Sequence, residues 1–244
     1  LRVLEVPFLL ETEAEIDAVY ARFGPELEKA LDDAGYVLIG WAEVGFIHLF
    51  TKKPVATLAD LRDQKMWLWE GDPLPEALFA EAHVAPVSLA ITDVYTSLQT
   101  GLVDGVYSSP YGCVVLQWHT QVSAMSEVPI THAIGAVVVS KPAFEKASSG
   151  AQAKVREIAA DVFARLKAAS RLENRKAIVD IKQAGIAIVP VVPKELETFR
   201  EIGARAAQRG VGTLYSQELL DRVRATVAEV RQQQSATSMV GEAQ

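Results

Sequence analysis

The side chains best suited to acid–base or nucleophilic chemistry are scattered along this chain. It has four histidines that lie far apart, at His48, His83, His119 and His132. None has another metal ligand at the i, i+4 spacing that places two ligands on one helix face. Cys113 is the single cysteine, and with His119 it would give a nucleophile and its base, but no third residue is placed to orient that base. A buried apolar thiol is the better interpretation, and we expect no metal site.

Motifs that hold phosphates, dinucleotides or a nucleophilic serine are absent as well. The sequence contains no G-x-S-x-G, no G-x-x-x-x-G-K, no G-x-G-x-x-G and no H-E-x-x-H. Asp93 and Asp104 come nearest to a carboxylate pair, but Asp104 with Gly105 is more simply a turn. We therefore expect no enzymatic activity and no cofactor.

Two tryptophans give the first pattern that suggests ligand binding. Trp67 and Trp69 are two residues apart in a strand-like run, so both project from one face, with Lys65 beside them. This face is either an aromatic wall for a ligand or a core face beneath a helix, and the indole N–H groups prefer a partner in both cases. The sequence leaves both interpretations open.

A second group of aromatic and hydroxyl side chains lies at the end of the strand-like run 104–108. It comprises Tyr107, Ser108, Ser109, Pro110 and Tyr111. Ligands of α/β sheets bind at the carboxyl ends of strands, which favours a pocket wall over the alternative, a surface turn.

Composition excludes some classes of partner. The 244 residues carry a formal net charge of −7, and because phosphate backbones bind basic patches, we expect no nucleic-acid partner. No apolar run approaches the roughly 18 residues of a membrane span. The chain does not open with a basic n-region and an apolar h-region, so we expect that any signal peptide has been removed.

Hydrophobic periodicity predicts strands that alternate with helices. We expect strands over 1–10, 36–41, 45–51, 65–69, 84–89, 104–108, 133–139 and 186–192, and helices over 11–31, 74–83, 92–98 and 151–184. Thr57 followed by Asp60 is typical of a helix N-terminus. Such alternation favours a largely parallel sheet covered by helices. The stretch 151–184 has neither glycine nor proline, and its alanine-rich stripe lacks a sustained heptad, so we expect a strut that spans two lobes.

Three segments carry a resemblance to a known family. They are VPFLL at 6–10, WAEVGFIHLFTKKPVATLADLRDQKMW at 41–67 and DVYTSLQTGLVDG at 93–105. The last is the most specific. With these segments, the chain resembles the DctP-like solute-binding proteins of TRAP transporters over nearly its whole length.

The resemblance implies an α/β, two-lobed periplasmic-binding-protein-like fold with a long helix spanning both lobes. Lobe I would comprise 1–43 and 132–172, and lobe II 44–131 and 173–244, with chain crossings near Gly45 and His132. The implied protein is periplasmic, closes over a small molecule by hinge motion and delivers it to integral-membrane TRAP permease subunits. We expect a monomer. The family's opening strand–helix–strand units have no counterpart before Leu1, which implies an N-terminally incomplete first lobe.

The resemblance also implies a ligand site, and there the sequence departs from the family. The carboxylate-clamping arginine falls on Trp67, a second arginine falls on Ile47, and the usual asparagine is Ser108. Tryptophan cannot form the two parallel bonds of an arginine fork, so we expect a neutral or largely apolar ligand. The alternative is an organic acid held by Lys65 or His132, and an α/β enzyme is a weaker one. The expected cleft is lined by Phe46, Ile47, Trp67, Trp69, Ile91, Tyr107, Ser108, Tyr111 and His132.

Overall fold

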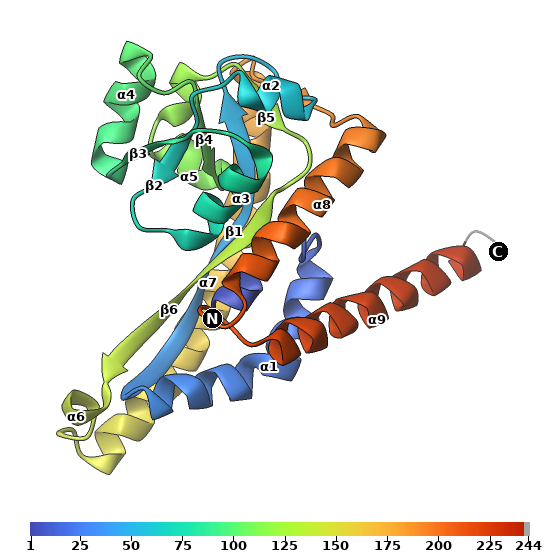
Figure 1. The fold of residues 1–244 in the computed structure, drawn as a ribbon. Coiled ribbons are helices and arrows are strands. Elements are labelled where there is room, and N and C mark those ends of the chain that lie inside the picture. The colour runs from blue at the N-terminus through green and yellow to red at the C-terminus, as the bar shows by residue number, and fades with distance from the viewer. Residues whose placement is uncertain (242–244) are drawn as a thin grey trace.

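The structure, a computed structural model, describes residues 1–241 and has a mixed α/β architecture (Figure 1). In chain order its elements are η1 (Arg2–Glu5), α1 (Glu13–Asp33), β1 (Tyr36–Thr51), α2 (Leu58–Arg62), β2 (Trp67–Trp69), α3 (Pro73–Ala82), β3 (Val87–Leu89), η2 (Ile91–Asp93), α4 (Val94–Thr100), β4 (Gly105–Ser108), α5 (Pro110–Val115), η3 (Trp118–Gln121), β5 (Ala124–Ser126), β6 (Thr131–Ser140), α6 (Lys141–Phe144), α7 (Ser149–Gln183), β7 (Ala187–Val189), α8 (Pro193–Gly210) and α9 (Gln217–Gly241).

Strand β1 is the centre of the main sheet. It pairs antiparallel with β4, β5 and β6, while β5 pairs parallel with β7. A separate two-stranded parallel sheet joins β2 to β3, and a bridge between Met66 and Gly105 links it to β4. The expectation of a largely parallel sheet is therefore wrong. The reason is that β1 and β6 run past each other as one long ladder, a pairing that needs no crossover helix.

The two expected crossing points lie next to each other in this ladder. Gly45 pairs with Ala133 and Phe46 with His132, just after a register shift between Glu43 and Gly45. Strand β1 runs toward the group of α2–α5, and β6 runs back from there toward α6 (Figure 1). Gly45 has a φ of +118°, a conformation that favours glycine, so the irregularity of the ladder is set by this residue.

Helix α7 confirms the long helix predicted from the sequence. It is 35 residues long, and the Ser148 side chain caps it by accepting a hydrogen bond from the Ala151 N–H at 3.3 Å. At 1.5 Å per residue it extends roughly 50 Å, alongside β1 and β6 (Figure 1). Gly185, with a φ of +84°, follows its end. The predicted helix N-terminus at Thr57 is confirmed by reciprocal hydrogen bonds between Thr57 and Asp60.

The expected strand over 1–10 is wrong. Residues Arg2–Glu5 form a 3-10 helix, and Phe8 has a φ of +57°. Val3 and Leu4 are buried in one apolar cluster with Ile16 of α1 and Val223 of α9. The apolar run is therefore explained by packing against helices from both ends of the chain.

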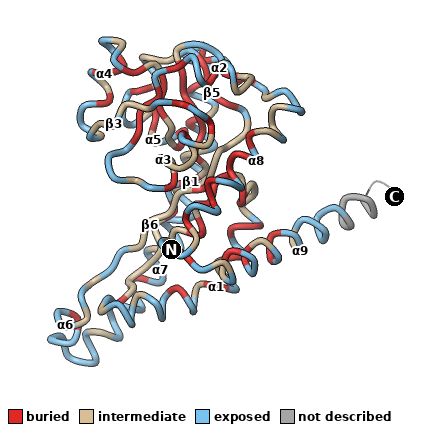
Figure 2. Tube along the Cα trace, viewed as in Figure 1, coloured by how far each residue is buried: buried red, intermediate tan, exposed pale blue. Residues whose placement is uncertain are grey.

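Buried residues gather in two places along the long ladder (Figure 2). Two clusters fill the region around β2–β5, one containing Phe50 and Trp67 and the other Met66 and Ile202. The third joins the N-terminal segment, α1 and α9. The expected boundaries place residues 173–244 in the second lobe. Residues 242–244 lie outside the described residues. We propose instead that α9 counts with α1 and the first lobe.

Candidate functional site

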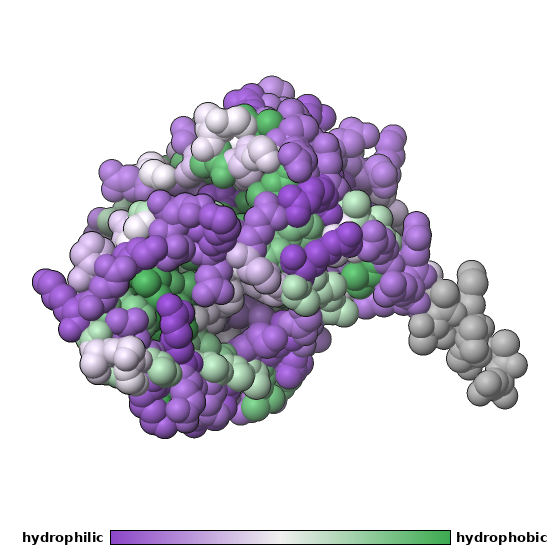
Figure 3. Space-filling model, turned by 90° about the horizontal axis from the view of Figure 1, so that it is seen from below, coloured by the Kyte–Doolittle hydropathy of each residue, from purple (hydrophilic) through white to green (hydrophobic). Residues whose placement is uncertain are grey.

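A cavity of about 800 Å³ lies between the N-terminal segment, the β1–β6 crossing and the segment from β2 to α3. Seen from below, the molecule is hollowed near its middle, with hydrophobic surface beside the hollow (Figure 3). Six of the nine expected site residues line the cavity: Ile47, Trp67, Trp69, Ile91, Tyr107 and Ser108. Pockets of this volume accommodate small molecules of moderate size.

Four aromatic residues form one side of the cavity, and we call them the aromatic wall: Trp67, Trp69, Tyr107 and Trp118. The Trp67 ring stacks on Tyr107 at a centroid distance of 5.1 Å and meets Trp118 edge-on at 5.3 Å. Trp69 lies 6.0 Å from Trp67. Because β2 is a strand, alternation places Trp67 and Trp69 on the same face.

Both interpretations that the sequence left open, a ligand wall and a core face, apply to Trp67. Its exposed fraction is 1%, and it belongs to a core cluster, yet it also lines the cavity. Its Nε1–H donates to the Leu89 carbonyl at 2.9 Å, which satisfies the indole and fixes the ring. Trp69 has an exposed fraction of 48% and is free to contact a ligand.

Trp118 is the wall residue that sequence reasoning missed. It lies in η3, far along the chain from β2, and only tertiary folding brings it against Trp67. No periodicity or motif in the sequence marks it, although a tryptophan in a short irregular segment is a useful signal once a first aromatic residue has been placed.

Three expected site residues lie outside the cavity lining. Phe46 neighbours Ile47 in β1, so the two side chains point to opposite faces of the strand, and its ring packs edge-on against His132 at 5.3 Å. His132 is paired with Phe46 across the ladder and is fully buried. Tyr111 is exposed on α5, and its N–H donates to Asn174 Oδ1 at 3.1 Å.

The charged lining of the cavity consists of Arg2, Glu5, Glu70 and Asp72. Arg2 bridges Glu5 and Asp72, and its Nε is buried without a hydrogen-bond partner. Burial raises the pKa of Glu5, opposed by the charge of Arg2. Sequence reasoning missed Arg2, because its segment was expected to be a strand.

Lys65 does not line the cavity. Its ammonium group contacts the Gly101 carbonyl and lies 3.6 Å from Asp104. Since His132 is also outside the lining, Arg2 is the cationic side chain that the described residues place in the cavity.

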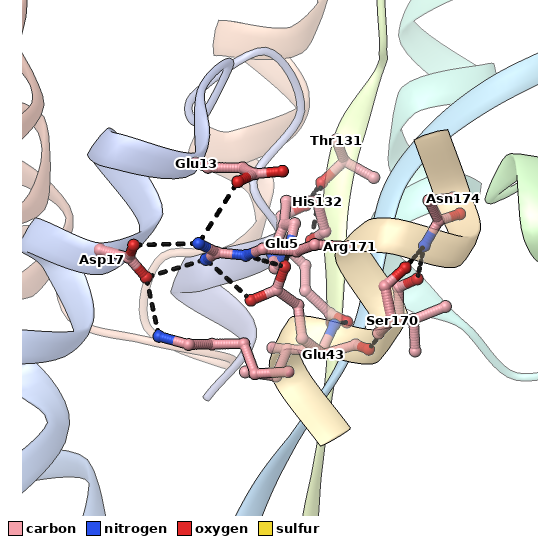
Figure 4. A network of polar contacts seen from close by, with 12 residues as sticks. Glu5, Glu13, Asp17, Glu43, Thr131, His132, Ser170, Arg171 and Asn174 are labelled. Carbon is pink, nitrogen blue, oxygen red and sulfur yellow. Dashed lines mark hydrogen bonds and ion pairs between the residues drawn. The ribbon is translucent and has the colours of Figure 1, made fainter. Parts of the chain in front are cut away.

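A polar cluster lies where α7 crosses β1, and we call it the β1–α7 network (Figure 4). Arg171 donates to both oxygens of buried Glu43, at 2.9 and 3.0 Å, and to both oxygens of Asp17. Burial acts to raise the pKa of Glu43, but the neighbouring His132 and Arg171 outweigh it and hold the pKa below its usual range. Hydrogen bonds from Arg171 also lower the pKa of Asp17.

The same network fixes the irregular part of β1 against α7. Ser170 Oγ donates to the Glu43 carbonyl at 2.7 Å, and Asn174 Nδ2 donates to the Val44 carbonyl at 2.9 Å. A Cβ on Gly45 would lie 2.6 Å from that Asn174 nitrogen. His132 lies at the edge, with Nε2 3.6 Å from Glu43 Oε1 and neither ring nitrogen hydrogen-bonded.

Two further findings concern metal ligands and apolar helices in the part of the chain that the structure describes. Its His, Cys, Asp and Glu side chains form no group of three or more that could hold a metal ion. None of its helices is both long and apolar enough to cross a membrane.

Comparison with solved structures identifies the architecture. The sugar acid binding protein of Advenella mimigardefordensis, solved in complex with galactonate, matches with a TM-score of 0.85 at 20% identity, covering 93% of this chain and 74% of that one. The expected two-lobed binding-protein fold is thereby confirmed.

Sequence relatives identify the family. The pattern described as bacterial extracellular solute-binding protein, family 7 (DctP) matches residues 1–211. A solute-binding protein of Verminephrobacter eiseniae is 26% identical over 196 residues, covering 79% of this chain, and the chain spans 58% of that relative's length. The C4-dicarboxylate-binding periplasmic protein of Rhodobacter capsulatus is 25% identical over 234 residues, covering 94% of this chain and 67% of that protein. The expected periplasmic location agrees with this family, and the chain belongs to family 7 of the bacterial extracellular solute-binding proteins, the DctP-like proteins of TRAP transporters.

Proposed function

We propose that this protein captures a neutral or largely apolar small molecule against the aromatic wall and delivers it to integral-membrane TRAP permease subunits. The observation that supports the proposal is the cavity itself, which Trp67 lines; by the resemblance described above, Trp67 takes the position of the family's carboxylate-clamping arginine. Apolar ligand surface placed there gains roughly 25 cal/mol per Å² buried. The other proposed contacts are Ile47, Trp69, Ile91, Tyr107 and Ser108, all of which line the cavity.

An organic acid is the second candidate, because the relatives from R. capsulatus and A. mimigardefordensis are named for a C4-dicarboxylate and a sugar acid. The cation in reach would be Arg2, in place of Lys65 or His132. Arg2 is already shared by Glu5 and Asp72. A ligand carboxylate would have to compete with Glu5 and Asp72 for this guanidinium. Burying a carboxylate without a partner costs roughly several kcal/mol.

Calorimetry decides between the two ligand classes. We expect measurable binding of neutral aromatic or aliphatic compounds and weak or absent binding of C4 dicarboxylates and sugar acids. Trp67→Arg, which restores a guanidinium at this position, should shift the preference toward acids. Because Trp67 is part of the core, its variant is first checked for folding by circular dichroism. Tight binding of a dicarboxylate by the unmodified protein, with no neutral ligand bound, would reject the proposal.

The proposal also includes the absence of turnover and a monomeric state. Among the described residues, neither a histidine nor a cysteine lines the cavity. Burial raises the pKa of Cys113 far above its usual range, which suppresses the thiolate. Incubation with a bound ligand followed by product analysis tests for turnover. Light scattering of the purified protein tests the monomer.

A further inference from the structure

We propose that the preferred ligand is an organic cation, an apolar or aromatic body that carries an ammonium group. This inference rests on the proposed function, since it concerns the polar end of a largely apolar ligand in the same cavity. Two independent features support it, the charge of the lining and the aromatic wall.

The first feature is an excess of carboxylates. Among the described lining residues, Glu5, Glu70 and Asp72 oppose the single cation Arg2. Glu5 and Asp72 share that guanidinium, whereas no ion pair or hydrogen bond engages the side chain of Glu70 within the described chain. The cavity therefore carries a net negative charge, and a ligand cation entering it would reduce a repulsion that a ligand anion would increase.

The second feature is the aromatic wall. Cations are attracted to the negative faces of aromatic rings, most strongly to indole, and recognition of quaternary ammonium groups by aromatic cages is the best-known use. In the wall, the rings of Trp69, Tyr107 and Trp118 each have their centroid within 6.0 Å of the Trp67 ring. Trp69, the most exposed of the indoles, directly precedes Glu70 in the chain, and both residues line the cavity.

Other polar groups of the wall are compatible with this assignment. The Tyr107 hydroxyl accepts a hydrogen bond from the Trp69 N–H at 3.0 Å, and the Trp67 N–H is engaged by Leu89. The indole of Trp67 and the main-chain N–H of Trp69 are thus not available to stabilise a ligand carboxylate.

Three probes with the same aromatic body and chain length test the inference: 2-phenylethylamine, 2-phenylethanol and phenylacetate. We expect the amine to bind about tenfold tighter than the alcohol at low ionic strength, within the range of a partly desolvated cation–π contact. Raising the salt from 20 to 200 mM, roughly a threefold shortening of the screening length, should weaken binding of the amine and leave the alcohol unchanged.

A charge-neutralising variant identifies the carboxylate involved. Glu70→Gln should weaken binding of the amine about two- to fivefold, the effect of one exposed ion pair, without changing binding of the alcohol. Glu76→Gln is the matched control, because Glu76 is exposed at the start of α3 and does not line the cavity. It should change neither affinity.

The outcomes separate this inference from the proposed function. If the alcohol binds as tightly as the amine or more tightly, the ammonium inference is overturned and the neutral-ligand proposal stands. If phenylacetate alone binds, both are overturned. If Glu76→Gln weakens binding of the amine as much as Glu70→Gln does, the assignment of Glu70 is wrong.

Discussion

Strand β1 contributes Glu43 to the β1–α7 network and Ile47 to the cavity, yet the two regions differ in how completely their carboxylates are paired. In the network, Arg171 satisfies two carboxylates at once, and Ser170 and Asn174 occupy the backbone carbonyls of the irregular segment. In the cavity, one guanidinium is divided between two carboxylates while Glu70 stays unpaired. A dense group of ionisable residues is therefore a poor guide to a binding site when its carboxylates already have cationic partners.

The first prediction uses this contrast to measure how much the network stabilises the fold. Arg171→Ala leaves buried Glu43 without its main partner, and removing one member of a buried pair costs about 3–5 kcal/mol. The free energy of unfolding, measured with urea, should fall accordingly. The control is Arg175→Ala, whose guanidinium pairs with Glu13 at 2.7 Å but is 59% exposed, for which we expect about 0–1 kcal/mol. Equal losses in both variants would mean that the network is not structural.

The second prediction concerns His48, a buried residue of β1. Burial lowers the pKa of His48 to about 4, against the effect of its hydrogen bond with the Ser126 carbonyl. The unfolded chain therefore takes up a proton below pH 6.5 that the folded chain refuses until about pH 4. Stability should fall as the pH drops through this window, by about 3 kcal/mol at roughly 1.4 kcal/mol per pKa unit.

Urea titrations between pH 7.5 and 4 measure this dependence. His48→Asn keeps a donor toward Ser126 but cannot be protonated, so its stability should vary less across the window than that of the unmodified protein. Identical pH profiles for the two proteins would show that His48 does not contribute.

The third prediction tests the irregular ladder. Gly45→Ala places a side chain at a φ of +118° and 2.6 Å from Asn174 Nδ2, and we expect a loss of about 1–3 kcal/mol. Gly150→Ala is the matched control because Gly150 lies in α7 and nothing lies within 4 Å of the position of its added Cβ, so the substitution should stabilise by about 0.4–1 kcal/mol. Thermal melts of both variants should shift in opposite directions; shifts in the same direction would refute the role given to Gly45.

The fourth prediction changes the cavity instead of the network. Trp69→Leu removes a half-exposed indole, so the free energy of unfolding should change by less than about 1 kcal/mol, as expected for a surface substitution. Affinity for a neutral aromatic ligand should fall about tenfold, which equals about 1.4 kcal/mol. A variant with full affinity, or one that loses stability instead of affinity, would show that Trp69 is part of the core and not of the binding surface.

Local patterns in the sequence were sufficient for much of the fold. The helical period over 151–184 and the pairing of Thr57 with Asp60 both correspond to elements that short-range forces determine. The prediction of a strand over 1–10 was wrong because an apolar run indicates that the residues are buried, but not which elements bury them. Here those neighbours are α1 and α9, and α9 comes from the other end of the chain.

In the candidate site, too, local patterns were predictable and tertiary contacts were not. Trp67 and Trp69 were predicted to share a face from alternation alone, and β2 places them so. Alternation also separates Phe46 from Ile47, which the expected residue set had ignored. Trp118 and Arg2 were out of reach, because each joins the cavity through tertiary contacts with residues far away in sequence.

The position of β1 in the chain has a consequence for how the protein is made. The partner of Glu43 in the network, Arg171, is 128 residues further on, and the ladder partners in β6 follow β1 by 84 residues at Ile47 and Thr131 and by 104 at Tyr36 and Ser140. A ribosome releases the chain in order, so β1 emerges long before the strand and helix that cover it. Loop closure over such separations slows folding, and an uncovered strand edge is prone to pair with other chains. We expect nascent chains that end before Thr131 to be the ones most dependent on chaperones.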